Sequence, residues 1–201
     1  YSMCEDIDQV SRITGEMLEI SESHGLIFWQ AHALRNRGWA MGHRGCISEG
    51  LQMLEEGDAL WLGSGALVMR TMHHYLVAEL HGLAGDIELG LAATQKGLQL
   101  VKKHNDHWYH AELVRMEGWL RQQNGQKDQA LKLFGQAIQI ARQQQNAWWL
   151  LRAAKSKAAL LLDIGDYQAA RELLLPIYGQ FSKGAGFKDL TEARSLLKAL
   201  A

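Results

Sequence analysis

The sequence has 201 residues, of which 21 are basic and 22 acidic, and its net charge at pH 7 is -1. A charge so close to zero argues against binding of nucleic acid or an anionic membrane, since both usually require a basic surface. One proline and a hydrophobic fraction of 47% favour helices over sheets, and two cysteines cannot hold a disulfide framework. No apolar run approaches the roughly 20 residues of a membrane span. We therefore expect a cytoplasmic, all-α protein.

Small residues recur along the chain with a period of 40. A glycine stands at four equivalent positions: Gly45, Gly85, Gly125 and Gly165. Seven residues earlier and five residues later, the chain again carries only Gly or Ala: Gly38, Ala78, Gly118, Ala158, Gly50, Gly90, Ala130 and Ala170. Small residues at this spacing are typical of a tetratricopeptide-like helix-turn-helix repeat, in which they let two antiparallel helices approach closely. The pattern predicts a right-handed α-solenoid with a 40-residue period.

The period places the helices in chain order. Residues 6–24 are predicted to form the second helix of a truncated repeat, and four full repeats follow it. The first helices of these repeats are expected over 26–44, 66–84, 107–124 and 147–164, and the second helices over 47–62, 87–103, 127–145 and 167–182. A last helix over 189–200 then closes the stack.

The whole chain, 1–201, is thus predicted to be a single α-solenoid. It comprises a partial repeat over 1–25, four helical hairpins over 26–184 and a capping helix over 185–201. Because the pattern is already under way at the first residue, we expect the chain to be a piece of a longer protein.

The turn inside each hairpin has its own residues. The glycine of the period, such as Gly85 or Gly165, is predicted to end the first helix in a left-handed conformation. Asp86 and Asp166 follow directly and are predicted to cap the second helix.

One stretch resembles a known family. Residues 107–118 read His-Trp-Tyr-His-Ala-Glu-Leu-Val-Arg-Met-Glu-Gly. This is similar to the segment Trp-Tyr-x-Ala-Glu-Leu-x-Arg-x-x-Gly in the C-terminal repeats of bacterial proteins that join a class III adenylate/guanylate cyclase domain to an AAA/STAND-type ATPase. The resemblance implies a regulatory tail in signal transduction. The sequence contains no Walker A loop, so the ATP-binding chemistry of such a parent would lie elsewhere.

Candidate binding residues follow from the expected architecture, in which the first helix of each repeat lines a concave groove. Counting along the period places these residues there: His32, Arg35, Trp39, Tyr75, Glu79, Glu112, Arg115, Trp119, Arg152 and Lys155. The pair Arg35 and Trp39 recurs two periods later as Arg115 and Trp119. An arginine beside an indole can bind a carboxylate while the ring covers an apolar neighbour, which suits a peptide or an acidic small molecule.

A structural role for the same residues is the competing interpretation. Glu112 can neutralise Arg115 or Arg152 across adjacent helices, and the tryptophans can simply be buried between repeats. Under that interpretation the residues hold the helices together, and they bind nothing.

The histidines do not indicate a metal site. No carboxylate or cysteine completes a ligand set around His104, His107 and His110 at a usual spacing. His73 and His74 are sequence neighbours and would point about 100° apart on a helix, so we interpret them as solvated or hydrogen-bonded. We expect neither a metal nor a cofactor.

The sequence offers no nucleophile with a base or an oxyanion hole, and we therefore do not expect an enzyme. It predicts a protein-interaction and sensing module, the C-terminal tail of a cyclase- or ATPase-linked signalling protein. Such a tail would bind a protein or peptide partner in its groove and contact its own N-terminal head domains. The alternative is a sensor whose groove encloses a small-molecule inducer.

Overall fold

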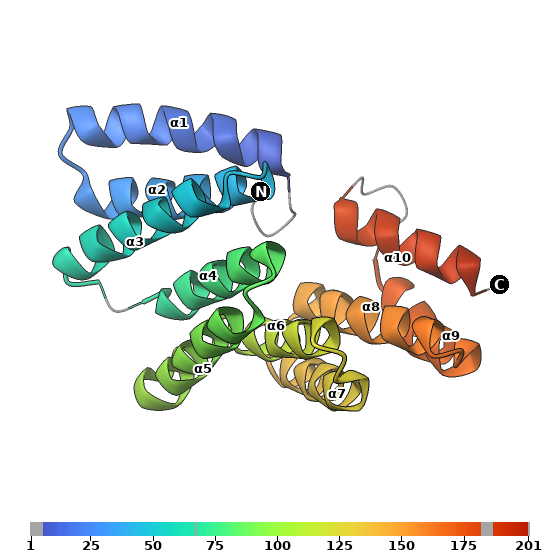
Figure 1. The fold of residues 1–201 in the computed structure, drawn as a ribbon. Helices are drawn as coiled ribbons and strands as arrows, with labels where there is room; N and C mark the ends of the chain where they lie inside the picture. Colours follow the sequence, from blue (N-terminus) through green and yellow to red (C-terminus); the bar gives the residue numbers. More distant parts are fainter. Residues whose placement is uncertain (1–5, 67, 182–186, 201) are drawn as a thin grey trace. The chain divides into compact units, whose positions relative to one another are not determined.

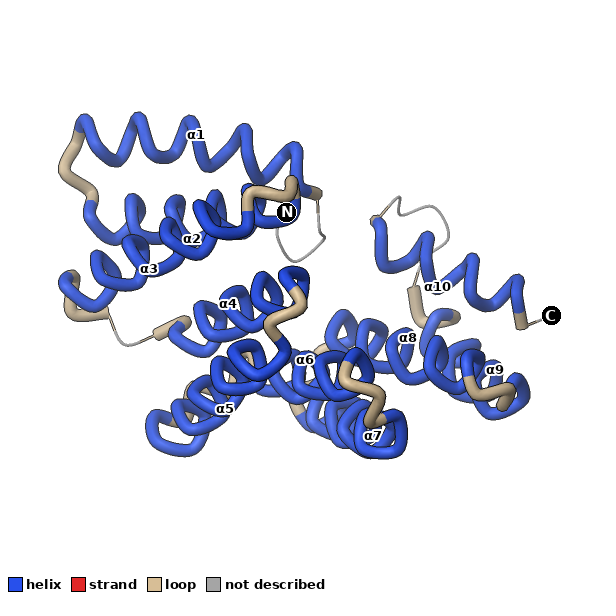
Figure 2. The backbone as a smooth tube through the Cα atoms, in the orientation of Figure 1, coloured by secondary structure: helices blue, strands red, loops and turns tan. Residues whose placement is uncertain are grey.

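The computed structural model describes residues 6–66, 68–181 and 187–200. Within these ranges every regular element is a helix, which confirms the all-α prediction (Figure 2). No described helix is both long and apolar enough to span a membrane. The helices are α1 (Ile7–Ser23), α2 (Ile27–His43), α3 (Ile47–Gly63), α4 (Arg70–Ala84), α5 (Ile87–His104), α6 (His110–Gln123), α7 (Lys127–Gln143), α8 (Ala147–Asp163), α9 (Tyr167–Tyr178) and α10 (Lys188–Ala199).

The 40-residue period of the sequence is also the period of the helices. Helices α1, α3, α5, α7 and α9 begin at residues 7, 47, 87, 127 and 167. The other helices begin at 27, 70, 110, 147 and 188, so α10 takes the place of a further first helix. Figure 1 shows the hairpins α2–α3, α4–α5, α6–α7 and α8–α9 that result.

The chain divides into two compact units, one up to Tyr109 and one from His110 onward. In the first unit α1 packs on α2, and the hairpin α2–α3 packs on α4. In the second unit the hairpin α6–α7 packs on α8, and α10 packs on α8 and α9. The prediction of one continuous solenoid over 1–201 stays a prediction, and its boundary at residues 184 and 185 lies outside the described residues.

Small residues bring the two helices of a hairpin into backbone contact. A Cβ atom on Gly50 would lie 2.5 Å from the carbonyl oxygen of Gly38, and one on Gly38 would lie 2.6 Å from that of Gly50. In the third hairpin a Cβ on Gly118 would lie 2.8 Å from the ring of Phe134, which is fully buried. No side chain larger than hydrogen fits at these places without movement of a neighbour. This confirms the predicted role of the small residues.

The turn glycines also behave as predicted, with φ values of +94°, +84°, +75° and +84° at Gly45, Gly85, Gly125 and Gly165. Of the two predicted caps, Asp166 is confirmed, because its Oδ1 accepts from the Ala169 backbone N–H at 3.1 Å. The prediction for Asp86 is wrong. It stands at the N-cap of α5, but its side chain makes no cap bond. Its Oδ2 lies instead 3.7 Å from Nδ1 of His81.

Some helix boundaries differ from the prediction. Helix α4 begins at Arg70 and not at 66, because Met69 directly before it takes a left-handed conformation with a φ of 57°. Helix α6 begins at His110 and not at 107, since Asn105 ends α5 with a φ of 56° and a short turn follows. Helix α9 ends at Tyr178, four residues earlier than predicted, with the poor helix former Gly179 at its C-cap.

The contact at Gly118 gives a test of the fold. Replacing Gly118 with Leu should lower the free energy of unfolding by about 1–3 kcal/mol, because the side chain would overpack the contact with Phe134. Chemical denaturation would measure the change. Gly135→Leu is the matched control, since a Cβ there would meet only Nζ of Lys157, at 3.5 Å. Equal stability of the two variants would contradict the close approach of α6 and α7.

Candidate functional site

An open groove of about 550 Å³ lies in the second unit, against α6, α8 and α10. Two of the predicted groove residues, Trp119 and Lys155, are in its walls. The fully buried Phe134 lies beneath, where it forms a hydrophobic core with Ala130 and Leu160, and Trp119 packs against that core. The groove is lined by Trp119, Gln122, Phe134, Lys155, Ser156, Ala159, Thr191, Glu192, Ser195 and Leu196.

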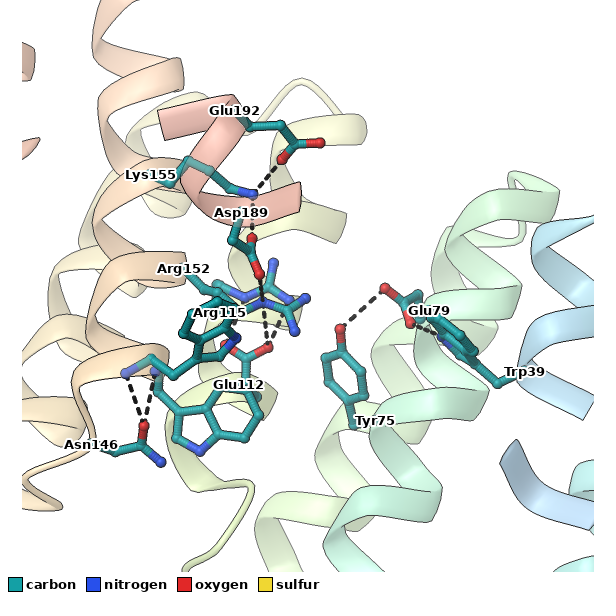
Figure 3. A network of polar contacts seen from close by, with 12 residues as sticks. Trp39, Tyr75, Glu79, Glu112, Arg115, Asn146, Arg152, Lys155, Asp189 and Glu192 are labelled. Atoms are coloured by element: carbon teal, nitrogen blue, oxygen red, sulfur yellow. Dashed lines mark hydrogen bonds and ion pairs between the residues drawn. The ribbon is translucent and has the colours of Figure 1, made fainter. Parts of the chain in front are cut away.

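The predicted residue Glu112 does not face this groove but pairs with two arginines inside the unit (Figure 3). Its carboxylate is completely buried. Arg115 donates to both of its oxygens, from Nε and from Nη2, at 2.9 Å each. Nε of Arg152, on α8, lies 3.4 Å from Oε2 of Glu112. The expectation that Glu112 neutralises Arg115 or Arg152 is therefore confirmed for both.

The ion-pair network continues to α10. Oδ2 of Asp189, in the first turn of α10, lies 3.8 Å from Nε of Arg152. Lys155 donates from Nζ to Asp189 and to Glu192, as Figure 3 shows. Asp189 is buried, with an exposed fraction of 1%. Helix α10, which forms one wall of the groove, is thus tied to α8 by charge.

Sequence reasoning missed the groove wall that α10 supplies. The signal was present, because α10 continues the 40-residue period. Adding 40 to Arg152 and Lys155 leads to Glu192 and Ser195, and both line the groove. The prediction treated residues 185–201 only as a cap and left these positions out.

In the first unit, the predicted residues Trp39, Tyr75 and Glu79 form a buried cluster of their own. The indole Nε1 of Trp39 donates to Oε2 of Glu79 at 2.6 Å, and the Tyr75 hydroxyl donates to Oε1 at 3.1 Å. Nε2 of His43 lies 3.5 Å from the same carboxylate. Glu79 therefore joins α2 to α4 through buried hydrogen bonds, with Trp39 exactly one period before it in sequence.

Arg35 is almost wholly buried, with an exposed fraction of 1%. Its Nη2 donates to the Met69 carbonyl at 2.8 Å, and its guanidinium carbon lies 4.8 Å from the ring centroid of Trp61. The half-buried His32 is close by, and burial, with a smaller contribution from Arg35, lowers the pKa of His32. The Arg35–Trp39 pair thus differs from its later copy, because Trp39 is buried whereas Trp119 reaches the groove.

The interpretation of His73 as solvated or hydrogen-bonded is wrong. The residue is buried, and its Nδ1 has no hydrogen-bond partner among the described residues. Its Nε2 lies 3.8 Å from Oδ2 of Asp58. Burial lowers the pKa of His73 to about 3 and that of His74 to about 4, and nearby cations add to both effects. Within the described ranges, no three His, Cys, Asp or Glu residues are grouped to hold a metal ion.

Comparison with known sequences gives one distant relative and no family. No protein-family model matches the chain. An uncharacterized protein of Rhizobium meliloti (strain 1021) is 25% identical over 162 residues. The alignment covers 80% of this chain but only 16% of that protein, so the chain spans a small part of its relative's length.

Comparison with solved structures shows the fold. The chain is similar to BtubC (BKLC) from P. vanneervenii, with a TM-score of 0.71, 13% identity and coverage of 100% of this chain and 83% of that chain. It is also similar to the tetratricopeptide-like repeats of a Podosopora anserina protein described as a kinesin light chain, with a TM-score of 0.57, 16% identity and coverage of 91% and 96%. A third match is the APC/C hetero-tetramer Cut9–Hcn1, with a TM-score of 0.62, 15% identity and coverage of 98% and 40%. The chain therefore has the tetratricopeptide-like α-solenoid fold that the sequence predicts.

The buried network around Glu112 can be tested through stability. Glu112→Gln should lower the free energy of unfolding by about 3–5 kcal/mol, because it removes the buried carboxylate that pairs with Arg115 and that Arg152 shares with Asp189. Denaturant titration would measure this. Glu192→Gln is the control, since the Glu192 side chain is 45% exposed and its loss should cost no more than about 1 kcal/mol. Similar losses in both variants would contradict the network.

The buried His73 predicts a specific dependence of stability on pH. Above pH 6.5 the folded and unfolded chains both hold this ring neutral, whereas between pH 6.5 and pH 3 only the unfolded chain binds a proton. The free energy of unfolding should then fall by about 1.4 kcal/mol per pH unit on account of His73. His73→Gln should make the fall with decreasing pH shallower by that amount. The exposed His24, changed to Gln, should leave the slope as it is.

Proposed function

We propose that the chain is a protein-interaction module and that the groove against α6, α8 and α10 binds a peptide segment of the partner. The observation that carries the proposal is the groove itself, about 550 Å³ in volume, with an aromatic wall at Trp119 over the core residue Phe134. A volume of this size is within the range of sites that enclose a ligand of several hundred daltons.

The chemistry of the lining suits a peptide. Trp119 and Leu196 offer apolar surface for a large side chain, and tryptophan is among the residues that contribute most to binding energy at interfaces. Short polar side chains accompany them, and these can pair with the N–H and C=O groups of a bound backbone: Gln122, Ser156, Thr191 and Ser195. The charge of Lys155 is already balanced by Asp189 and Glu192, so it does not favour an acidic ligand.

The fold neighbours support an interaction role. One is described as a kinesin light chain, and another was solved as the hetero-tetramer Cut9–Hcn1, a complex of two kinds of chain. A repeat fold presents a large surface of regularly spaced helices, which suits binding better than chemistry.

We further propose that the chain is a regulatory tail of a longer signalling protein that carries nucleotide-binding head domains. This finer proposal is supported by the resemblance of residues 107–118 to the repeats of cyclase–ATPase proteins. It is also supported by the length of the Rhizobium meliloti relative, of which the chain spans 16%. In such a protein, a partner held by α6, α8 and α10 would favour one arrangement of these helices over others.

The groove can be tested with a displayed library of random peptides selected against the chain. We expect enriched peptides to share a large apolar residue. Their affinity should fall about tenfold or more with Ala159→Glu, which puts a charge among the apolar lining, and with Trp119→Ala. Ala159 is exposed, so the melting temperature of Ala159→Glu should change little. Trp119→Ala also removes packing against the core and should lower the melting temperature, so Ala159→Glu is the variant that separates binding from stability.

The control is Gln139→Glu, which adds the same charge at an exposed position of α7 outside the groove lining. Peptides that bind all variants equally, or a library without enrichment, would contradict the proposal. A small metabolite that binds in place of the peptides and is lost with Ala159→Glu would favour the small-molecule sensor instead.

A further inference from the structure

The groove of the second unit and the buried cluster of the first unit involve equivalent positions of the repeat. Trp39 of α2 and Glu79 of α4 are one period apart. Two periods later the same positions hold Trp119 of α6 and Ala159 of α8, and both of these line the groove. The carboxylate that meets the tryptophan in the first unit is therefore absent from the second unit.

In the first unit the chain itself supplies the hydrogen-bond partner of the tryptophan. The indole Nε1 of the buried Trp39 donates to Oε2 of the buried Glu79 at 2.6 Å. Oε1 of the same carboxylate accepts from the Tyr75 hydroxyl at 3.1 Å. A buried indole N–H requires such an acceptor, because without one it keeps the full cost of losing its water. Glu79 thus shows that an oxygen acceptor suits the position opposite this tryptophan.

In the second unit the equivalent position is open. Ala159 is exposed and has no side chain beyond Cβ, and the groove of about 550 Å³ lies against it. The ring of Trp119 is half-buried, yet its indole N–H donates to no acceptor among the residues that the structure describes. The groove has room for a side chain of a ligand, which would supply the missing acceptor.

The charges of the lining determine which kind of acceptor fits. The lining carries one cation and one anion, Lys155 and Glu192, and these two are paired with each other. Lys155 also donates to the buried Asp189, so its charge is already balanced. A carboxylate of the ligand would share the groove with Glu192 and be repelled by it. The acceptor that the groove favours is therefore an uncharged oxygen.

We propose, building on the peptide-binding function proposed above, that the groove takes the uncharged carboxamide side chain of a glutamine or asparagine in the bound peptide. Its oxygen accepts from Nε1 of Trp119, as Glu79 accepts from Trp39. Its NH2 group donates to acceptors of the lining, which the carboxylate of Glu192 and the hydroxyl of Ser195 supply. A carboxamide thus meets both the unpaired donor and the acceptors of the groove, which neither a carboxylate nor an apolar side chain does.

Parallel selections from a displayed library of random peptides test the role of the indole N–H. Peptides enriched on the unmodified chain should carry Gln or Asn at a fixed spacing from their large apolar residue. On Trp119→Phe, which keeps an aromatic ring but removes the N–H, the apolar residue should remain and the carboxamide should lose its enrichment. The control is Trp29→Phe, the same change at an exposed tryptophan of α2, which should enrich the same peptides as the unmodified chain.

Synthetic peptides then measure the preference by titration calorimetry. In one enriched peptide, the carboxamide residue is replaced by its acid, Glu or Asp, and by an apolar residue of similar size, Met or Leu. Each replacement should weaken binding to the unmodified chain about tenfold, because it leaves the N–H of Trp119 unpaired or adds a repelled charge. With Trp119→Phe the carboxamide and apolar peptides should bind equally, as expected when the two changes remove the same contact.

Ala159→Gln places a carboxamide in the groove as part of the chain and so reproduces the arrangement of the first unit. It should weaken binding of the carboxamide peptide about tenfold or more. It should also shift the Nε1–H signal of Trp119 in nuclear magnetic resonance spectra in the direction that the peptide does. Ala147→Gln is the control, since it makes the same change at an exposed position of α8 outside the lining.

The outcomes separate this inference from the proposed function. Enriched peptides with a large apolar residue but no carboxamide would overturn the inference and leave the peptide groove standing. The same holds if the acid binds as tightly as the carboxamide, if Trp119→Phe keeps the preference, or if Ala159→Gln leaves the Trp119 signal unmoved. A library without any enrichment would contradict the proposed function and the inference together.

Discussion

The close approach of two helices at small residues such as Gly38, Gly50 and Gly118 is the constraint on which the rest of the structure depends. Where the carbonyl of Gly38 lies against the α-carbon of Gly50, neither helix can slide or rotate without a clash. The α2–α3 hairpin is thereby fixed in register. The repeated pattern of small residues then brings residues one period apart to comparable places. The hydrogen bond from Trp39 to Glu79, 40 residues later, is a direct result, because it joins the first helices of two successive hairpins.

Close packing of the hairpins leaves polar groups buried between the first helices. The two units provide these groups with hydrogen-bond and charge partners to different degrees. Around Glu112, the positive charges of Arg115 and Arg152 face the negative charges of Glu112 and Asp189. Such a network adds little net stability, since the charges lose their water, but it penalises any other arrangement of α6, α8 and α10. Arg35 of the first unit is less completely satisfied: its Nη2 donates to the Met69 carbonyl and its guanidinium lies over the ring of Trp61, but its Nε and Nη1 have no hydrogen-bond partner among the described residues.

The sequence was sufficient to predict the hairpins but not to predict which of their residues are exposed. The spacing of Gly38 and Gly118 predicted close contacts, because the absence of a side chain is visible in the sequence itself. Which face of a first helix stays open depends on the helices that pack against it, and this made the groove only partly predictable. Counting the period placed both Glu112 and Trp119 in the groove, yet the first is fully buried and only the second lines it. The late start of α4 at Arg70 follows from the left-handed conformation of Met69, which could not be predicted from the residue type.

Ligand binding in the groove of the second unit is coupled to the position of α10. Helix α10 contributes Thr191, Glu192, Ser195 and Leu196 to the lining, and its Asp189 forms ion pairs with Lys155 and Arg152 of α8. A ligand that contacts both helices binds only while this arrangement persists, so binding stabilises α10 against α8 by the full ligation free energy. By reciprocity, any contact that moves α10 lowers the affinity of the groove by the same factor. The buried Asp189 connects these two effects, because it pairs with both Lys155 and Arg152 and does not line the groove, so its charge affects the position of α10 without contact to a ligand.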